Sequence, residues 1–195
     1  MVSGHYGLNS IEEVNTKIIE VMAAMENHTV EHFTWMGTGT SGIPNGIPYN
    51  ANHWMAVIYK LHANNYGIVE MESYGTGTGY KVRAIVINGV LGDWEWENPP
   101  MALGIEYRTT ERYLGNPVYT KLIDYGSMPN STAKRVQHGA SVKDVKRCSG
   151  YVHTACWTFP SPSVTMYADA SGVSITTTGD FSAESAYVQI WYTKA

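Results

Sequence analysis

The chain has 195 residues, of which 44% are apolar, 12% aromatic and only 15% charged. A disordered chain combines low hydrophobicity with high charge, so this composition excludes disorder as the dominant state. Every apolar run is interrupted well before about 18 residues, so we expect no membrane-spanning helix and no insertion into a membrane. At about 150 residues per domain, the length allows one domain or two small ones.

The charge is divided unevenly along the chain. Residues 1–100 carry 10 acidic and 4 basic side chains, whereas residues 101–195 carry 7 and 9, for a net charge of −4. The change falls near Pro99-Pro100 and predicts a domain boundary there. Neither half is basic enough to predict binding to nucleic acid. The N-terminal residues have neither a charged nor an apolar signal region, so no secretory signal is expected.

Cysteine and histidine usage gives no positive sign of a metal site. Cys148 and Cys156 are too few for a disulfide framework or a structural zinc site, and the sequence leaves their pairing open. Residues 28–32 match the H-x-x-E-H pattern of inverted zinc peptidases, which requires a helix. Here β-forming residues follow, and on a strand the two imidazoles would lie about 13 Å apart. We therefore expect no metal and no cofactor.

The first predicted element is a helix over residues 10–26. Ser10 followed by Glu13 forms a capping-box pattern, which satisfies free backbone donors at the start of a helix. Apolar residues then recur at spacings of three and four, at Ile11, Val14, Ile18, Val21 and Met25. Such a stripe has two interpretations. It fits an amphipathic helix docked on its own domain, or a short coiled-coil seam whose β-branched core positions favour trimers.

After residue 27 the pattern changes from helix to strand. Segments rich in Val, Ile, Tyr and Trp, with turn residues between them, predict an antiparallel sheet. These segments are residues 29–36, 53–61, 66–74 and 80–88. The segments at 37–49 and 75–79 hold so many Gly, Pro and Asn residues that we expect loops, and Asn88-Gly89 predicts a tight turn. The first half is thus expected to be one helix against a small sheet.

Residues 98–104 interrupt this pattern, and the second half consists almost wholly of short strands. The β-rich runs follow one another at spacings of about ten residues, which favours a small β-sandwich. They are residues 117–125, 140–145, 150–157, 163–167, 173–178 and 186–193. The expected fold class is therefore mainly β, with an α+β part at the N-terminus.

No familiar catalytic motif is present. The sequence lacks the nucleophile elbow, the phosphate-binding loop and the dinucleotide fingerprint, so we expect no enzymatic activity. Glu95 and Glu97 could share a strand face as a glycosidase pair does, but solvated surface carboxylates have the same pattern. The loose basic stretch at 134–147 could contact an anion such as a phosphate-bearing polymer, although a solvated face is the simpler interpretation.

A sugar-binding surface needs an exposed aromatic ring, because a pyranose has one apolar face, and it needs polar groups for the hydroxyl rim. Five residues of the second half are candidates for such a surface: Tyr151, His153, Trp157, Tyr167 and Asp169. The first three lie along one β-rich run, and the last two precede a turn at Ser171-Gly172. A place in the core or in a subunit interface is the alternative for each.

A resemblance to a known family is carried by residues 94–130. They read WEWENPPM at 94–101, EYRTTERY at 106–113, PVYTK at 117–121 and MPN at 128–130. The sequence of residues 94–130 closely resembles the C-terminal part of tail fibres from phages and prophages of gut and other low-GC Gram-positive bacteria. Residues 67–96, with YKVR at 80–83 and a W-x-W ending, resemble the knob module of pyocin-type fibres. Residues 186–194 resemble the final strand of many fibre tips.

The resemblance implies a homotrimeric distal tail fibre of a virion, made in the host cytoplasm. Its tip would attach to a carbohydrate or cell-wall polymer of the host surface, and it would join upstream fibre or baseplate proteins. It implies a helix at 1–27 whose stripe forms the threefold seam, a knob-like domain at 28–100 and a receptor-binding sandwich at 101–195. No binding residue is carried over.

Two other functions compete with non-catalytic attachment. One is a tailspike enzyme that cuts a polysaccharide, whose usual β-helix repeats of about 20–25 residues are not found in this sequence. The other is a purely structural segment of a fibre.

Overall fold

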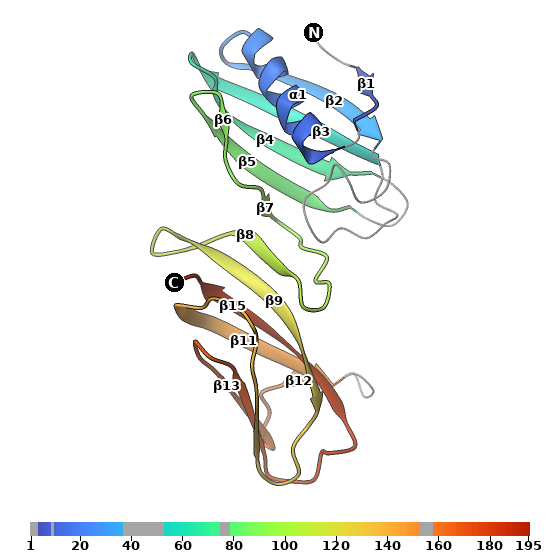
Figure 1. The fold of residues 1–195 in the computed structure, drawn as a ribbon, viewed down its shortest axis with the longest axis vertical. Coiled ribbons are helices and arrows are strands. Elements are labelled where there is room, and N and C mark those ends of the chain that lie inside the picture. The colour runs from blue at the N-terminus through green and yellow to red at the C-terminus, as the bar shows by residue number, and fades with distance from the viewer. Residues whose placement is uncertain (1–3, 9, 37–52, 75–78, 153–157) are drawn as a thin grey trace. The chain divides into compact units, whose positions relative to one another are not determined.

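The computed structural model describes residues 4–8, 10–36, 53–74, 79–152 and 158–195. The chain divides into two compact units, Met1–Pro100 and Met101–Ala195, and the division falls where the charge composition changes. The described residues form one helix and otherwise strands, nearly all of them antiparallel (Figure 1). The mainly β fold class predicted from the sequence is confirmed.

Unit 1, Met1–Pro100, is a sheet with a helix on one face (Figure 1). Its four long strands lie in chain order, each antiparallel to the next. They are β2 (Thr29–Met36), β3 (His53–His62), β4 (Tyr66–Ser73) and β5 (Lys81–Ile87). Short β1 (His5–Tyr6) pairs with β2, and β6 (Val90–Leu91) and β7 (Glu95–Trp96) pair with β5.

The four long strands confirm the segments predicted from the alternating pattern. Asn88 and Gly89 form the turn between β5 and β6 with φ angles of 52° and 75°, a left-handed conformation that these two residue types tolerate. The predicted loop at 37–49 and most of the one at 75–79 lie outside the described residues.

The helix α1 (Ile11–Ala24) is fixed at both ends by polar side chains. At its start, the Ser10 hydroxyl accepts a hydrogen bond from the Glu13 N–H at 3.1 Å, as the capping pattern predicts. At its end, the buried ammonium of Lys60 from β3 donates to the carbonyls of Met22 (2.9 Å) and Met25 (2.7 Å). The last carbonyls of a helix lack partners within it and carry partial negative charge, so the lysine both satisfies and neutralises them.

The apolar stripe of α1 is buried within unit 1, which corrects the predicted trimer seam. Val14, Ile18, Val21 and Met25 are buried in the single chain, and Ile11 is half-buried. A threefold seam would need these side chains at the surface of the chain. The structure therefore shows the docked-helix interpretation, and the helix belongs to the first unit instead of forming a region of its own at 1–27. Helical spacing reveals an apolar face but not what covers it.

Unit 2, Met101–Ala195, is a β-sandwich of two antiparallel sheets. The larger sheet has the order β8 (Glu106–Tyr113), β9 (Asn116–Ser127), β15 (Ser185–Thr193), β11 (Asp144–Val152) and β12 (Thr158–Phe159). The smaller has the order β10 (Ala133–Val136), β14 (Val173–Thr177) and β13 (Val164–Ala168). Residues such as Val188, Ile190 and Ile175 fill the core between them.

The strand pattern of unit 2 differs from the prediction at β11, β8 and β10. Residues 144–152 form the single strand β11, whereas the sequence predicts separate runs at 140–145 and 150–157, of which residues 153–157 lie outside the described residues. Gly150 looks like a strand break, but it provides space for a ring, since a Cβ there would lie 2.0 Å from Phe159. The sequence pattern also misses β8 and β10, in which charged residues hide the alternation.

Candidate functional site

The structure separates the predicted sugar-binding residues onto the two outer faces of the sandwich. Tyr151, between buried Gly150 and Val152, points outward from β11 and is 39% exposed. Tyr167 points outward from β13 and is 62% exposed, and Asp169 lies in the turn that follows it. His153 and Trp157 lie outside the described residues. Of the three candidates that the structure describes, only Tyr167 and Asp169 therefore belong to one surface.

That surface is the outer face of the smaller sheet, here called the Tyr167 face. Cross-strand register places Tyr167 beside Ser174 and Ser174 beside Arg135, so one row runs across all three strands. The neighbouring row runs from Thr165 through Thr176 to Ala133. The outward residues of the face are Thr165 and Tyr167 from β13, Ser174 and Thr176 from β14, and Ala133 and Arg135 from β10. One exposed ring thus stands among hydroxyl groups.

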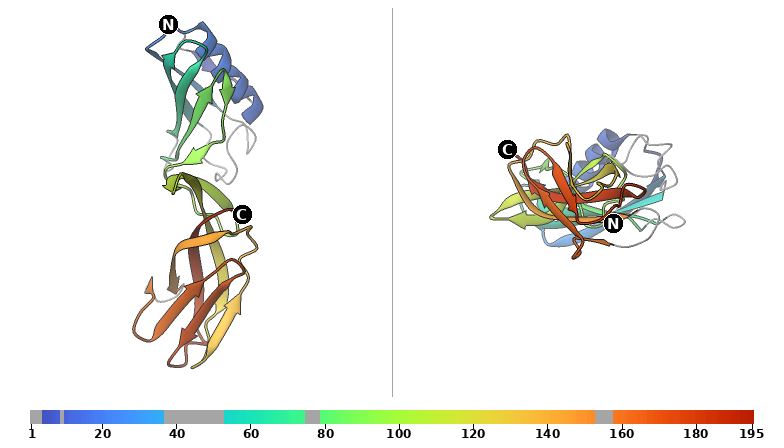
Figure 2. Two further views of the ribbon diagram at one scale, coloured as in Figure 1. Left: turned by 90° about the vertical axis from the view of Figure 1, so that its left-hand side faces the viewer. Right: turned by 90° about the horizontal axis from the view of Figure 1, so that it is seen from below.

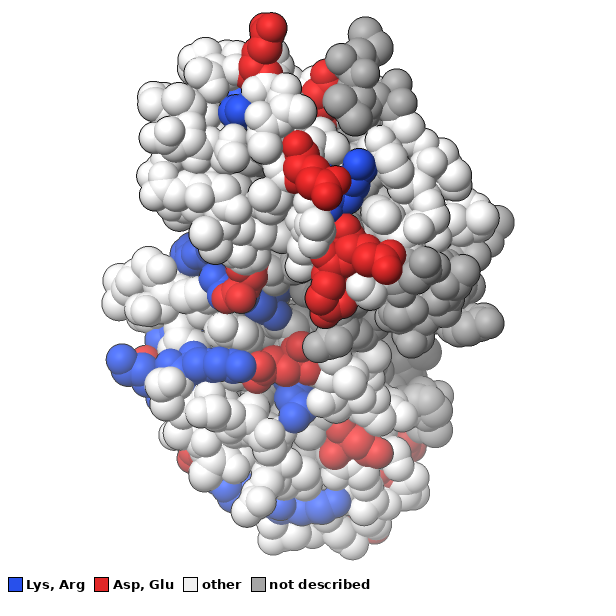
Figure 3. Space-filling view, turned by 45° about the horizontal axis from the view of Figure 1, so that its top comes forward, with Lys and Arg blue, Asp and Glu red and all other residues white. Residues whose placement is uncertain are grey.

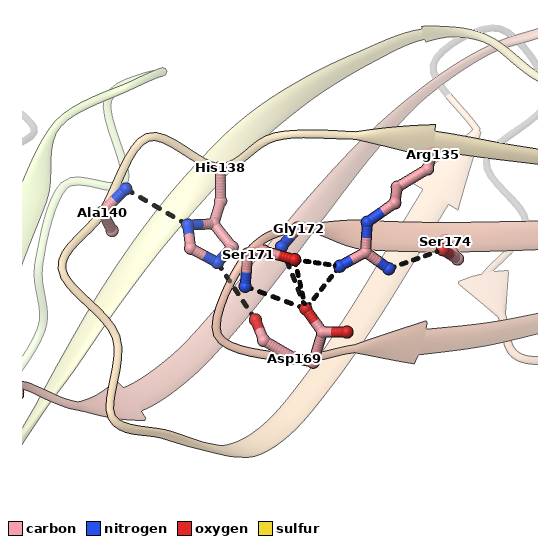
Figure 4. A network of polar contacts seen from close by, with 7 residues as sticks. All are labelled: Arg135, His138, Ala140, Asp169, Ser171, Gly172 and Ser174. Atoms are coloured by element: carbon pink, nitrogen blue, oxygen red, sulfur yellow. Dashed lines mark hydrogen bonds and ion pairs between the residues drawn. The ribbon is translucent and has the colours of Figure 1, made fainter.

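A polar network fixes the end of this face (Figure 4). The guanidinium of Arg135 donates to the Asp169 carboxylate, to the Ser171 hydroxyl and, at 3.1 Å, to the Ser174 hydroxyl. The same Asp169 oxygen accepts from the backbone N–H groups of Ser171 (2.8 Å) and Gly172 (3.2 Å). The arginine therefore joins β10 to the β13–β14 turn, and the carboxylate shapes the turn itself.

These hydrogen bonds keep Asp169 ionised. The Ser171 N–H is the largest influence, followed by Arg135, and together they hold the pKa of the Asp169 carboxyl well below its usual range. The carboxylate and the guanidinium thus lie at the edge of the Tyr167 face as fixed charges over the whole neutral range. Each also keeps unused hydrogen-bonding positions, since a carboxylate has two oxygens and a guanidinium five N–H groups.

His138 supports the turn from beneath. The side chain is buried, its Nδ1 accepts from the Ala140 N–H at 3.1 Å, and its Nε2 lies 3.1 Å from the carbonyl oxygen of Asp169. Because a carbonyl oxygen can only accept, Nε2–H is the donor of this hydrogen bond. Asp169 is thus held at its carbonyl by His138 and at its carboxylate by Arg135, without any ligand.

The Tyr167 face has the chemical features of a shallow saccharide-binding surface. The ring offers an apolar plane for the C–H face of a sugar, while the serine, threonine, arginine and aspartate groups offer donors and acceptors for its hydroxyl rim. The framework around the turn is fixed by the hydrogen bonds described above, which lowers the ordering cost of binding. The face offers one exposed ring, so a single contact with a sugar is expected to be weak.

The opposite outer face carries an aromatic pair. The rings of Tyr151 and Tyr187 lie 5.5 Å apart across β11 and β15. Farther along the same strands, the guanidinium of Arg147 lies 4.3 Å above the ring of Trp191 and forms an ion pair with Glu111 at 2.6 Å. Trp191 is therefore covered by a cation that is itself held in place.

Three of the five basic residues in the stretch predicted at 134–147 are held in ion pairs. Arg135 is paired with Asp169, Arg147 with Glu111 and Lys146 with Asp144. Blue and red side chains also lie side by side on the face shown in Figure 3. This agrees with the simpler interpretation of a solvated face.

Arg135, Ser174 and Thr176 are residues of the site that the sequence analysis misses. Ser174 and Thr176 belong to a predicted strand, but outward hydroxyls on a strand are common and give no signal by themselves. Asp169 followed by Ser171-Gly172 does predict a turn in which the carboxylate accepts backbone N–H groups. Nothing in the sequence connects that turn to Arg135, which lies 34 residues earlier.

Over the residues that the structure describes, no three His, Cys, Asp or Glu side chains lie close enough together to hold a metal ion. In the same residues, no helix has the length and apolar character needed to cross a membrane. The thiol of Cys148 is free and half-buried, and burial raises its pKa. Cys156 lies outside the described part of the chain.

Comparison with solved structures finds two tail fibres. One is an N-truncated R2-type pyocin tail fibre, with 8% identity and a TM-score of 0.32, covering 81% of this chain and 90% of that one. The other is the C-terminal part of the R2 pyocin fibre of P. aeruginosa, with 8% identity and a TM-score of 0.28, covering 97% and 65%. Similarity of this size does not establish a shared fold. No protein-family model and no curated protein matches the chain.

Proposed function

We propose that the chain is a receptor-binding protein of a phage-type tail fibre, carried on the virion, whose Tyr167 face attaches to a carbohydrate of the host surface without cutting it. The observation that carries the proposal is the 62% exposed Tyr167 ring in a fixed frame of hydroxyls and the Arg135–Asp169 pair. The resemblance of residues 94–130 to tail fibres supports the same role.

A shallow face of this kind works best in several copies. One aromatic ring with a few hydrogen bonds gives weak binding to a single sugar, whereas linked copies on a repeating glycan gain avidity without new contacts. We propose a homotrimer joined to upstream fibre or baseplate proteins. In solution its mass would be three times the 21.6 kDa of one chain.

The test is binding of the purified chain to a panel of immobilised bacterial cell-wall polysaccharides. For a polysaccharide that binds, Tyr167→Ala is expected to weaken the affinity at least about tenfold, roughly 1.4 kcal/mol. Tyr167→Phe keeps the ring and should retain most of the binding. Tyr151→Ala, on the opposite outer face, is the matched control and should bind as the parent does. A thermal melt of each variant checks that the sandwich is intact.

The other outcomes separate the competing functions. Loss of binding in Tyr151→Ala and not in Tyr167→Ala would move the site to the opposite face of the sandwich. Release of reducing sugar from a bound polysaccharide would indicate a tailspike enzyme. If the chain binds neither a polysaccharide of the panel nor intact bacterial cells, the proposal is contradicted. The competing function, a structural segment of a fibre, would then be favoured.

A further inference from the structure

Tyr167 differs from every other tyrosine of unit 2. Each of the others contacts a cation, a second ring or a hydrogen-bond partner within the chain, as Tyr119 does with the ammonium of Lys194. Tyr167 has no such contact with the residues that the structure describes, and it is 62% exposed. Its ring and its hydroxyl are therefore both available to a ligand.

The Tyr167 face as a whole carries no surplus charge. The left view of Figure 2 shows its three strands side by side, and the side chains that point outward from them are uncharged except for Arg135. Asp169, in the turn at the edge, balances that charge through an ion pair with the guanidinium. The neighbouring cation, Lys134, has the buried Ile175 as its register partner, so it belongs to the inner side of the sheet. The charges at the face therefore sum to zero.

A charged ligand would have to disturb the ion pair at this edge. An anion that approached the guanidinium of Arg135 would compete with Asp169 for its N–H groups and would lie beside the displaced carboxylate. A cation that approached Asp169 would meet the charge of Arg135 in the same way. Like charges brought together in a complex oppose binding. The Asp169 carboxylate also accepts from the N–H groups of Ser171 and Gly172, so its displacement would loosen the turn as well.

The hydrogen-bonding positions that remain at the pair suit a hydroxyl group. The contacts of the Asp169 carboxylate in Figure 4 are all made by Oδ1, and Oδ2 has no partner among the described residues. The guanidinium of Arg135 has five N–H groups and donates to three oxygen atoms. An acceptor and a donor are thus left together. A hydroxyl group both donates and accepts, whereas an ionised carboxylate only accepts and an ammonium group only donates.

We infer that the Tyr167 face binds a neutral saccharide rich in hydroxyl groups and discriminates against polymers that carry carboxylates, phosphates or ammonium groups. The Arg135–Asp169 pair sets this preference, and the Tyr167 ring supplies the apolar contact. The inference rests on the proposed function and adds the class of saccharide to it. It gives the face a different ligand from the phosphate-bearing polymer considered for the basic stretch at 134–147.

The experiment compares two forms of one polymer as probes. One is the neutral polysaccharide of the panel that the parent chain binds most tightly, and the other is the same polysaccharide after oxidation of its primary hydroxyl groups to carboxylates. Titration calorimetry measures both affinities at moderate salt. The parent chain is expected to bind the neutral form at least about tenfold more tightly, because a carboxylate that reaches Arg135 also meets Asp169.

Two substitutions at the pair should shift this preference in opposite directions. Asp169→Asn keeps an oxygen for the N–H groups of the turn but leaves the charge of Arg135 unbalanced, so the ratio of neutral to oxidised affinity should fall at least about tenfold. Arg135→Gln leaves the Asp169 carboxylate unbalanced, so the ratio should rise above that of the parent. Loss of the fold would weaken both probes alike and cannot produce opposite shifts. Each variant is measured below its melting temperature.

Asp180→Asn controls for the change in total charge. Asp180 lies beyond the opposite end of β14 and shapes a turn as Asp169 does, by accepting from the N–H of Ser182 at 2.9 Å and from its hydroxyl at 2.7 Å. This variant loses the same charge outside the Tyr167 face, so its affinity ratio should equal that of the parent. A fall as large as that of Asp169→Asn would overturn the role of the Arg135–Asp169 pair.

The outcomes distinguish this inference from the proposed function. If binding depends on Tyr167 but the parent prefers the oxidised form, or binds only anionic polysaccharides of the panel, the receptor-binding role stands and the inference fails. The inference also fails if the parent prefers the neutral form and neither substitution at the pair changes the ratio. If no polysaccharide binds, or if Tyr167→Ala leaves binding unchanged, the proposed function of the face fails and the inference fails with it.

Discussion

The two units complete their cores by different means. In unit 1 a helix covers one face of the sheet. Ser10 caps the start of the helix, and Lys60 from β3 binds the carbonyls at its end. In unit 2 a second sheet takes the place of the helix. There the hydroxyl of Tyr125 on β9 crosses the core, donating to the carbonyl of Lys134 and accepting from the Ile175 N–H at 3.2 Å.

The element that covers the main sheet, a helix in unit 1 and a second sheet in unit 2, determines which residues each unit exposes. A covering sheet has an outer face of its own, and in unit 2 that face carries Tyr167 among hydroxyl groups. The helix of unit 1 uses its apolar stripe on the sheet, and the sheet itself keeps a second face with Val30 and Ile85 exposed. The polar surface suits a hydrated ligand, whereas the exposed aliphatic side chains of unit 1 lie on the sheet face away from the helix.

The largest effect expected from this comparison comes from a glycine beneath the helix. A Cβ at Gly67 would lie 2.3 Å from the backbone oxygen of Tyr59 and 2.8 Å from the Met22 side chain. Gly67→Ala should therefore destabilise unit 1 by about 3 kcal/mol, at the upper end of overpacking costs. Hydrogen exchange should accelerate in residues of unit 1 and not in unit 2. Gly7→Ala, also in unit 1, where a Cβ would meet nothing within 4 Å, tests whether any added methyl group has the same effect.

A smaller effect is expected when the attachment of the helix end is removed. Lys60→Met keeps much of the side-chain volume but leaves the carbonyls of Met22 and Met25 without their charged donor. Hydrogen bonds to charged groups contribute about 1.5–3 kcal/mol, so the midpoint of urea unfolding for unit 1 should fall accordingly. Lys17→Met removes the pair with Glu20 and a cation–π contact with the Tyr6 ring, and should change stability by about 1 kcal/mol or less. Equal effects of the two changes would contradict the assigned role of Lys60.

The smallest expected effect concerns the turn beside Tyr167 and depends on pH. The pKa of Asp169 is lowered in the folded chain, so its carboxylate contributes stability that is present above the ordinary value of 3.8 and lost as pH falls through the lowered value. Asp169→Asn should melt at a lower temperature than the parent from pH 7 to 4, by a nearly constant margin. The margin should shrink only in more acidic solution. A margin that disappears between pH 7 and 5 would show that the carboxylate is not held as described.

Much of the fold could be predicted because local signals and tertiary packing agree. The capping pattern at Ser10 locates the helix, and runs such as residues 29–36 become strands at the predicted positions because their alternation matches one buried face. Prediction fails where one sequence pattern is compatible with two different structures. The stripe from Ile11 to Met25 fits a trimer seam as well as a docked helix, and Gly150 resembles a strand break although it accommodates the ring of Phe159.

The candidate site could be predicted only in part. Tyr151 and Tyr167 have the same sequence context, an aromatic ring on a β-rich run, but strand order places them on different sheets. Spacing along a chain does not determine which strands pair, so it cannot bring Arg135 to Asp169. The exposed ring and the turn were within reach of sequence reasoning, whereas the cation that organises them required the sheet.

The position of β15 has a consequence for the order in which the protein forms. This strand is the last of unit 2 to be synthesised, yet it lies between β9 and β11, which have no pairing with each other. While residues 185–193 are still inside the ribosome, β9 and β11 lack the strand that joins them, so the larger sheet cannot be complete. Assembly of the sandwich is therefore a late event, at a stage when all four long strands of unit 1 have already emerged.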